Sequence, residues 1–293
     1  MTDYERLMEP KTLQIVPDAP QPDGDYASSD TLAGLFAHVT PSARTFFTGT
    51  LCETVRFAGA GHLHLLKQGV LTLTRNHEPV LVLTEPTLIF FPRDLVHSFV
   101  VDAQQGCDLA CATVELGGAE GNPIGQGLPD MVILPLAAHP ALAPVCDLLL
   151  AEAFARNPGR QAALDRLFDY LLILIVRHVV HSGAVTTGVL AGLADPRLAR
   201  ALTAMHDAPQ KPWTLEALAE RAGMSRTRFA EHFRQHIGRT PLEHLTAWRM
   251  TIARGLLSRG KPVQSVAAQV GYTSAAAFSR VFSRIEGRPP RSI

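Results

Sequence analysis

The sequence predicts an α+β fold: a β-barrel of the jelly-roll type, then a helical segment, then an all-α region with two helix-turn-helix motifs. Three observations predict it. Short β-type segments separated by Gly, Pro, Asn and Asp fill residues 43–134. After Pro135, apolar residues recur three and four positions apart. Near the C-terminus one unit occurs twice, and the 293-residue length allows two separate cores.

The first part of the chain has few structural signals. Residues 1–27 are rich in Pro, Asp and Gln, and we expect a poorly ordered leader there. A short helix is expected over 28–38, beginning at Ser29 or Asp30. The N-terminus lacks the basic and then apolar start of a secretory signal. The longest apolar run, residues 170–176, is too short to span a membrane, so we expect a cytoplasmic protein with no membrane partner.

The strand-rich region and the short helix form a predicted first domain, residues 28–134. Amphipathic helices over 141–155 and 160–180 form a helical segment, residues 135–182, and a glycine-containing linker follows over 183–196. Many short strands favour a sandwich or jelly roll. The strands are expected at residues 48–57, 62–66, 70–74, 80–83, 87–91, 97–101 and 109–116.

A repeated unit is the most informative feature of the C-terminal region. The stretch LEALAERAG at 215–223 recurs as VQSVAAQVG at 263–271, about 48 positions later. Each copy continues into Phe-x-x-x-Phe and then Gly-Arg-x-Pro. This pattern is typical of a helix, a tight glycine turn and a second helix, which enters the DNA major groove. Two such units predict a DNA-binding domain over 197–293.

Local signals support both copies. Thr214 is expected to cap the first helix, Gly223 to permit the left-handed turn and Ser225 to cap the second helix. In the second copy the cap is Thr273 or Ser274. Proline in its first turn and an amphipathic pattern predict one connecting helix over residues 241–258. The buried stripes are expected to be Phe229, Phe233 and Ile237 in one copy, and Phe278, Phe282 and Ile285 in the other.

These motifs resemble the DNA-binding domain of the AraC/XylS family of bacterial transcription regulators. The resemblance is carried by AAQVGY at 267–272, FSRVF at 278–282 and GRPP at 287–290. It implies double-stranded operator DNA as partner, dimerisation through residues 135–182, and RNA polymerase as a further partner of an activator. It also implies base-reading roles for Thr227, Glu231, Ala276 and Arg280, of which Arg280 suits guanine and Glu231 suits cytosine.

The distribution of charge supports a nucleic-acid partner. The chain is neutral overall, but residues 195–293 hold 16 Lys or Arg against 7 Asp or Glu, and residues 1–194 hold 11 against 20. A basic end of this kind is expected for phosphate contact, with binding that weakens as salt rises. Each arginine taken alone is as readily a solvated surface residue. The candidates for backbone contact are Arg226, Arg228, Arg239, Arg249 and Arg288.

Several residues of the strand region resemble the metal motif of the cupins. His62 and His64 share one strand face, Gln68 stands where that motif has glutamate, and His97 lies on a later strand. Converging imidazoles suit zinc, nickel, copper or iron. Two alternatives stay open here: a metal or effector site, and histidines that are hydrogen-bonded in a polar cavity.

The cysteines offer a second sensing chemistry. Cys107 and Cys111 are four residues apart, so on a strand they share a face and can approach the histidines, with Cys52 as a neighbour. Thiolate character beside histidine or metal would make them ligands or oxidant targets. The alternative is that these cysteines and Cys146 are small buried hydrophobes. His181, His206, His232, His236 and His244 are interpreted as surface or helix-packing residues.

Two classes of function follow. The first is a transcription regulator whose cupin-like domain senses a small molecule, metal or oxidant and controls operator binding. The second is an enzyme that carries a DNA-binding module, either a cupin-type oxygenase or isomerase or a thiol-transfer repair protein. No Ser-His-Asp or paired-carboxylate constellation is evident from spacing. We therefore predict a regulator rather than an enzyme.

Overall fold

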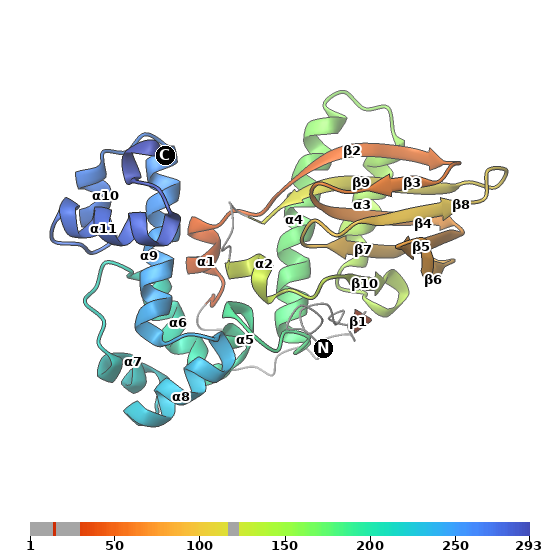
Figure 1. Cartoon of the computed structure of the whole chain (residues 1–293). Helices are drawn as coiled ribbons and strands as arrows, with labels where there is room; N and C mark the ends of the chain where they lie inside the picture. Colours follow the sequence, from red (N-terminus) through yellow and green to blue (C-terminus); the bar gives the residue numbers. More distant parts are fainter. Residues whose placement is uncertain (1–13, 16–29, 117–122) are drawn as a thin grey trace. The chain divides into compact units, whose positions relative to one another are not determined.

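The computed structural model describes residues 14–15, 30–116 and 123–293, and the chain divides into two compact units. The first contains residues 41–185 and the N-terminal strand, and the second contains residues 22–40 and 186–293. Apart from Gln14–Ile15, the predicted leader lies outside the described residues. Each unit is drawn in Figure 1 and has its own buried core.

The first unit is built on two β-sheets. A six-stranded sheet has the order β1-β10-β7-β4-β9-β2, and a four-stranded sheet has the order β3-β8-β5-β6. All pairs are antiparallel except β1 with β10. The strands are β1 (Gln14–Ile15), β2 (Ser42–Leu51), β3 (Val55–Phe57), β4 (Gly61–Gly69), β5 (Leu71–Arg75), β6 (Glu78–Leu83), β7 (Thr87–Phe91), β8 (His97–Val101), β9 (Cys107–Glu115) and β10 (Val132–Pro135).

The predicted strands correspond closely to the observed ones, with two corrections. The bounds of β7 and β8 are those predicted. The single strand predicted over 48–57 is wrong, because the exposed residues 52–54 separate β2 from β3, which lie in different sheets. Strands β1 and β10 were not predicted: β1 lies within the predicted leader, and a four-residue apolar run ending in proline, as in β10, carries little periodicity.

Apolar side chains from both sheets form the core of the first unit. Alternation along the strands places one face inward, as in β8, where positions 97, 99 and 101 are buried and Ser98 and Val100 are not. On β5, Leu71 and Leu73 are the buried positions of the same inward face. From the larger sheet, Ile89 and Leu109 join this cluster. The inner faces of the two sheets therefore contribute to one hydrophobic core.

Helices α3 (Ala143–Phe154) and α4 (Arg160–His181) confirm the helical segment predicted after the strands. Helix α4 lies along the edge strand β2, where Asp169 accepts from the backbone N–H of Ala43 at 2.7 Å and Asp165 from that of Thr45 at 2.8 Å. Strand β2 is an edge strand of the larger sheet, and these two carboxylates accept hydrogen bonds from its backbone N–H groups. The short helices of this unit are α2 (Pro123–Gly127) and the 3-10 turn Leu136–Ala138.

The second unit is helical within its described residues. None of the helices that the structure describes in the whole chain is long and apolar enough to cross a membrane. The helices of this unit are α1 (Ala33–His38), α5 (Val189–Ala194), α6 (Pro196–Asp207), α7 (Leu215–Ala222), α8 (Arg226–Ile237), α9 (Pro241–Ser258), α10 (Val263–Gln269), α11 (Ala275–Glu286) and the 3-10 turn Pro290–Ser292.

Two segments of this unit differ from expectation. The short helix predicted over 28–38 exists as α1, but it belongs to the second unit, where it packs against α6 and α9, and not to the predicted first domain. The second half of the predicted linker forms α5, whose Leu190 is fully buried. In both cases a short apolar helix is held by tertiary packing, which a local pattern of six residues does not reveal.

The predicted helix ends in the two repeats are largely confirmed. Thr214 accepts from the backbone N–H of Ala217, Gly223 is left-handed, and Ser274 caps α11. Helix α9 has the predicted bounds and begins with a capping box formed by Thr240 and Glu243. Ser225 stands at the N-cap of α8 without a side-chain hydrogen bond to the helix.

The buried stripe of α11 ends differently from the prediction. Ile285 is 44% exposed, so its assignment to the stripe is wrong. The reason is the spacing: the position four residues after Phe282 is Glu286, whose carboxylate meets Arg254 of α9 at 3.4 Å. Phe278 and Phe282 are fully buried, as predicted.

Two buried histidines lie in the core of the second unit. The Nε2 atoms of His206 and His244 are 3.2 Å apart, and the Trp248 ring lies 4.5 Å from that of His206. Burial lowers the pKa of His206 to about 3, and burial lowers that of His244 well below its usual range. This pair is therefore neutral in the folded protein.

We expect Gly34→Ala to lower the free energy of unfolding of the second unit by about 1–3 kcal/mol. A Cβ atom at position 34 would lie 2.6 Å from Asp207 Oδ1 and 2.9 Å from His206 Cβ, so α1 must move away from α6. Urea unfolding followed by tryptophan fluorescence measures this, because Trp213 and Trp248 both belong to this unit. Gly255→Ala is the control: its Cβ meets nothing, and it should stabilise α9 by up to about 1 kcal/mol.

We also expect the second unit to lose stability as the pH falls below 6.5. Below pH 6.5 the unfolded state binds protons that His206 and His244 do not bind in the folded state, which lowers the free energy of unfolding by about 2 kcal/mol at pH 5 for His206, and His244 acts in the same direction. Tryptophan-detected urea unfolding at pH 8 and pH 5 measures this difference. The His206→Gln, His244→Gln double variant should show a much smaller difference, and the exposed-site variant His77→Gln the parent's. Equal pH dependence in all three would contradict the assignment.

Candidate functional site

The four predicted base-reading residues lie on the exposed faces of α8 and α11. Thr227, Glu231, Ala276 and Arg280 are all exposed. The opposite faces of these helices are anchored by pairs of fully buried phenylalanines, with ring centroids 5.6 Å apart in α8 and 5.4 Å apart in α11. The amphipathic spacing therefore leaves the predicted reading positions accessible to a ligand as large as DNA.

The predicted backbone-contacting arginines divide into two groups. Arg228, Arg239 and Arg288 are exposed, and Arg226 is exposed while paired with Glu216 at 2.8 Å. Arg249 is half-buried. Its Nε donates to the Pro209 carbonyl at 2.7 Å and its Nη2 to the Lys211 carbonyl at 2.8 Å.

The guanidinium of Arg249 also lies over the Tyr272 ring. Its guanidinium is 5.8 Å from the centre of the Tyr272 ring, and burial lowers its pKa. The side chain thus connects α9 to the loop before α7 and to the turn after α10. Its Nε and Nη2 already donate to carbonyl groups inside the unit, which favours a structural role over the predicted phosphate contact.

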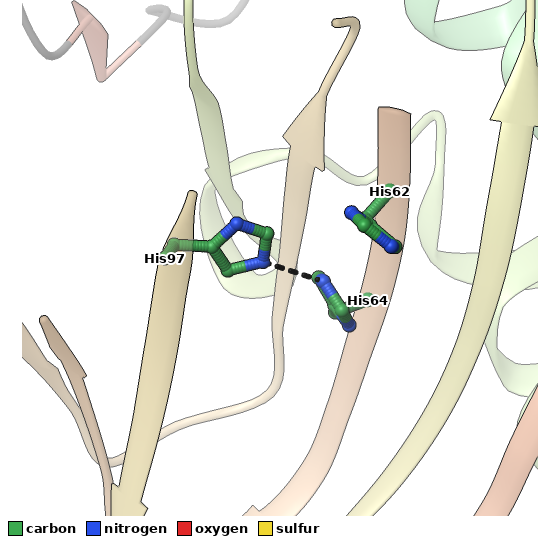
Figure 2. A group of neighbouring side chains, drawn as sticks. All are labelled: His62, His64 and His97. Carbon is green, nitrogen blue, oxygen red and sulfur yellow. Dashed lines mark hydrogen bonds between the residues drawn. The ribbon is translucent and has the colours of Figure 1, made fainter. Parts of the chain in front are cut away.

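In the first unit, three histidines converge between the two sheets. His62 and His64 extend from β4 of the larger sheet, and His97 extends from β8 of the smaller sheet (Figure 2). One ring nitrogen of each lies within 4.8 Å of the others, and all three side chains are buried. The predicted convergence of these residues is therefore present. We call this group the barrel triad.

A hydrogen bond joins the two sheets through the barrel triad. Nδ1 of His97 lies 2.6 Å from the Leu95 carbonyl, so it carries the proton and donates it. Nε2 of His97 is then an acceptor for the Nε2–H of His64 at 3.0 Å, the contact drawn in Figure 2. Among the described residues, no hydrogen-bond partner faces Nδ1 of His62 or of His64. Buried nitrogens without partners are what a bound ligand or ion would satisfy.

The triad is held neutral by its surroundings. Burial lowers the pKa of His97 to about 4 and that of His64 well below its usual range, and it also lowers the pKa of His62. The ring of Phe91 stacks on His97 at 3.7 Å, and that of Phe57 lies 5.1 Å from it on a nearly parallel plane. Neutral imidazoles in an apolar setting are suitable ligands for a transition metal or partners for a polar molecule.

Gln68 does not join the triad. It is exposed, and its amide donates to Asp108 at 2.8 Å. The pairing of β4 with β9 shifts between Leu66 and Gln68, and this irregularity breaks the alternation that would have returned residue 68 to the face of the histidines. The position predicted to stand in for a fourth ligand therefore lies away from the group.

The cysteines are close to the core but unsuited to thiolate chemistry. Cys107 and Cys111 both belong to the core between the sheets, and Cys111 is the cross-strand partner of His64. Burial raises the pKa of Cys107 to about 11 and raises that of Cys111 further, so both are neutral thiols. Of the two alternatives for Cys107 and Cys111, the burial of both thiols favours small buried hydrophobes over thiolates. Cys52 is exposed, and Cys146 is buried in α3.

Sequence reasoning missed the aromatic surroundings of the barrel triad. Phe57 is the last residue of β3 and Phe91 the last of β7, and nothing in their spacing from the histidines indicates a contact. Phe91 is the cross-strand neighbour of His62, so a correct pairing of β4 with β7 would have placed it there. The signal existed only at the level of strand register.

Comparison with known families matches both units. The family described as Cupin matches residues 30–181, which is just over half of the chain, and the family described as Helix-turn-helix domain matches residues 218–293. The cupin match includes β2 to β10 together with α3 and α4. The cupin match also includes α1, which packs in the second unit, and the helix-turn-helix match begins inside α7, so the bounds of the matches differ from those of the two units.

Two curated proteins are similar to this chain over most of their length. An uncharacterized HTH-type transcriptional regulator of Haemophilus influenzae is 35% identical over 247 residues, covering 77% of this chain and 83% of the relative. The RCS-specific HTH-type transcriptional activator RclR of Escherichia coli K12 is 30% identical, covering 79% and 85%. A solved regulator structure from Chromobacterium violaceum with an AraC-type DNA-binding domain is 26% identical, covers 33% of this chain and 88% of that one, and has a TM-score of 0.32.

Proposed function

This chain belongs to the AraC family of transcription regulators with an N-terminal cupin domain, and from that premise we propose that the barrel triad binds the signal that controls operator binding. The chain is a DNA-binding regulator, and the two relatives that are similar over most of their length are named as transcriptional regulators. The observation that carries the proposal is the convergence of three buried imidazoles from two different sheets.

We propose that the base-reading residues lie on helices α8 and α11. Thr227 and Glu231 on α8, with Ala276 and Arg280 on α11, are exposed in positions that match the family motif. Arg280 offers a guanidinium for guanine O6 and N7, and Glu231 offers a carboxylate for the cytosine amino group. Exposed Arg228, Arg239 and Arg288 and the basic charge of residues 195–293 support contact with phosphates.

The sensing part concerns how a signal acts at the triad. A ligand that binds ring nitrogens of His64 on β4 and His97 on β8 replaces the hydrogen bond between them and so changes how the two sheets are joined. For a signal to act, it must bind two arrangements of the domain with different affinity. We propose a divalent transition metal or a small polar molecule at this place. A zinc, nickel, copper or iron ion would be held by His62, His64 and His97 and would supply Lewis-acid affinity for a further ligand.

An oxidant signal has less support from the described residues. The relative RclR is named RCS-specific. Here Cys107 and Cys111 are neutral and buried, while only Cys52 is exposed among the four cysteines. A sensing reaction at Cys107 or Cys111 would first require the core of the first unit to open.

Dimerisation through the helical segment is part of the proposal. Leu148 on α3 and Tyr170 on α4 are large apolar side chains that are 57% and 49% exposed. Both belong to the segment through which a second copy of the chain is expected to dock. A dimer would present two DNA-binding units to one operator.

We expect Arg280→Ala to weaken specific operator binding by about 1–3 kcal/mol and to relax the preference at one base pair. The comparison is Arg288→Ala, whose loss should be similar on all sequences and should reduce the salt dependence of binding. Fluorescence anisotropy with the operator and with single-base variants measures both. A loss from Arg280→Ala that is equal on every sequence would refute the base-reading role.

If a metal occupies the barrel triad, His64→Ala and His97→Ala should each lower the metal content of the protein by one equivalent per chain. Gln68→Ala is the matched control, because its side chain faces away, and it should keep the parent's content. Elemental analysis after chelator-free purification under reducing conditions gives the numbers, and circular dichroism confirms folding. A parent protein without metal would leave the small polar ligand as the signal to seek.

A further inference from the structure

The second unit contains another group of metal-binding side chains, far in sequence from the barrel triad. Asp195, His232 and His236 each place one ligand atom within 4.8 Å of the others. All three side chains are half-buried, and none of them is a predicted base-reading position. Sequence reasoning interpreted both histidines as surface or packing residues, although their spacing was visible. We call this group the α8 cluster.

Helix geometry brings the two histidines together. Residues four apart lie on the same face of an α-helix, and the rings of His232 and His236 have centroids 4.2 Å apart. Nδ1 of His236 lies 2.9 Å from the His232 carbonyl and donates to it. The lone pair of the neutral ring is therefore on Nε2. Metal-binding histidines commonly have this arrangement, in which one ring nitrogen is fixed by a backbone carbonyl.

Asp195 supplies a carboxylate that is already fixed in place. It is the N-cap of α6, where its Oδ1 accepts from the backbone N–H groups of Arg197 and Leu198, both at 2.9 Å. Its Oδ2 accepts from His232 Nε2 at 2.8 Å. Burial raises the pKa of Asp195, but the hydrogen bonds from Leu198, His232 and Arg197 outweigh burial and lower it. The carboxylate is therefore ionised at neutral pH.

We propose that Asp195, His232 and His236 form a binding site for one divalent transition-metal ion of the zinc type. Two imidazoles and a carboxylate are a ligand set that zinc uses in proteins, with the fourth position left to water. Binding of the ion at Nε2 of His232 requires the other tautomer of that ring: the proton now donated to Asp195 is exchanged through solvent and Nδ1 carries it, so a lone pair on Nε2 becomes available. Ligand atoms around tetrahedral zinc lie about 3.3 Å apart, so small side-chain rotations suffice.

Metal at the α8 cluster would connect a recognition helix to the start of the second unit. Helix α8 carries Thr227 and Glu231 on its exposed face, and the ion would link it to the N-cap of α6. The same region is already joined by a hydrogen bond from the Gly188 N–H to the His236 carbonyl at 2.8 Å. The ion would stabilise this junction and hold α8 in one orientation. This role is independent of any ligand at the barrel triad.

The test is a zinc titration of the chelator-treated full-length protein, followed by calorimetry and by tryptophan-detected thermal unfolding. Because Trp213 and Trp248 both lie in the second unit, this fluorescence reports on that unit and not on the barrel. We expect zinc at about 100 times its Kd to raise the midpoint by about 10 °C. His232→Ala and His236→Ala should each lower the affinity more than about 100-fold, beyond what losing an outer partner costs.

Two further variants keep the result interpretable. Asp195→Asn preserves the helix cap but removes the charge, so it should fold normally and lose the zinc response. Gln235→Ala changes an exposed neighbour on the same helix and should respond as the parent does. A zinc-induced shift that is equal in the parent, Asp195→Asn and His236→Ala would overturn the proposal, as would the absence of any shift in the parent. Neither result bears on metal at the barrel triad, which elemental analysis of the His64 variant reports separately.

Discussion

The burial of four phenylalanines is the constraint on which the regulator's DNA-binding surface depends. Phe229 and Phe233 fix the rotation of α8 about its axis, and Phe278 and Phe282 do the same for α11. Because the periodicity of a helix is fixed, burying one stripe determines which residues are exposed on the other side. The two reading faces are thus set by hydrophobic packing, and the polar residues on them remain free to differ between relatives without affecting the fold.

Histidine chemistry recurs in both units with different degrees of burial. The barrel triad and the pair formed by His206 and His244 are buried deeply enough that the imidazoles stay neutral, because a protonated ring would lose its hydration there. In the pair, the partner of each ring is the other ring, and the role is packing. Among the described residues both groups contain buried nitrogens without a hydrogen-bond partner, Nδ1 of His206 in the pair and Nδ1 of His62 and His64 in the triad. The triad is the better candidate for ligand binding because it brings three ligand atoms within 4.8 Å of one another.

The sequence predicted most of the architecture, because its signals were repeated or periodic. The duplicated unit, the caps at Thr214 and Ser274 and the strands around His64 and His97 depend on local spacing alone. The failures have a common cause in long-range packing. A shift of register turned Gln68 outward, desolvation made Cys111 inert, and tertiary contacts held α1 and α5, whose few residues carry no helical signal of their own.

The placement of α1 has a consequence for how this protein can be divided. Helix α1 of the helical unit precedes strands β2 to β10 of the barrel unit in the chain, and helices α5 to α11 follow them, so most of the barrel unit lies between two parts of the helical unit's sequence. A fragment starting after α4 would lack α1. Gly34 of α1 packs against His206, and His38 of α1 contacts Trp248, so both core residues would be exposed to water on that side. A shortened version of this protein that is to keep this packing therefore needs α1, by fusion or as a separate peptide.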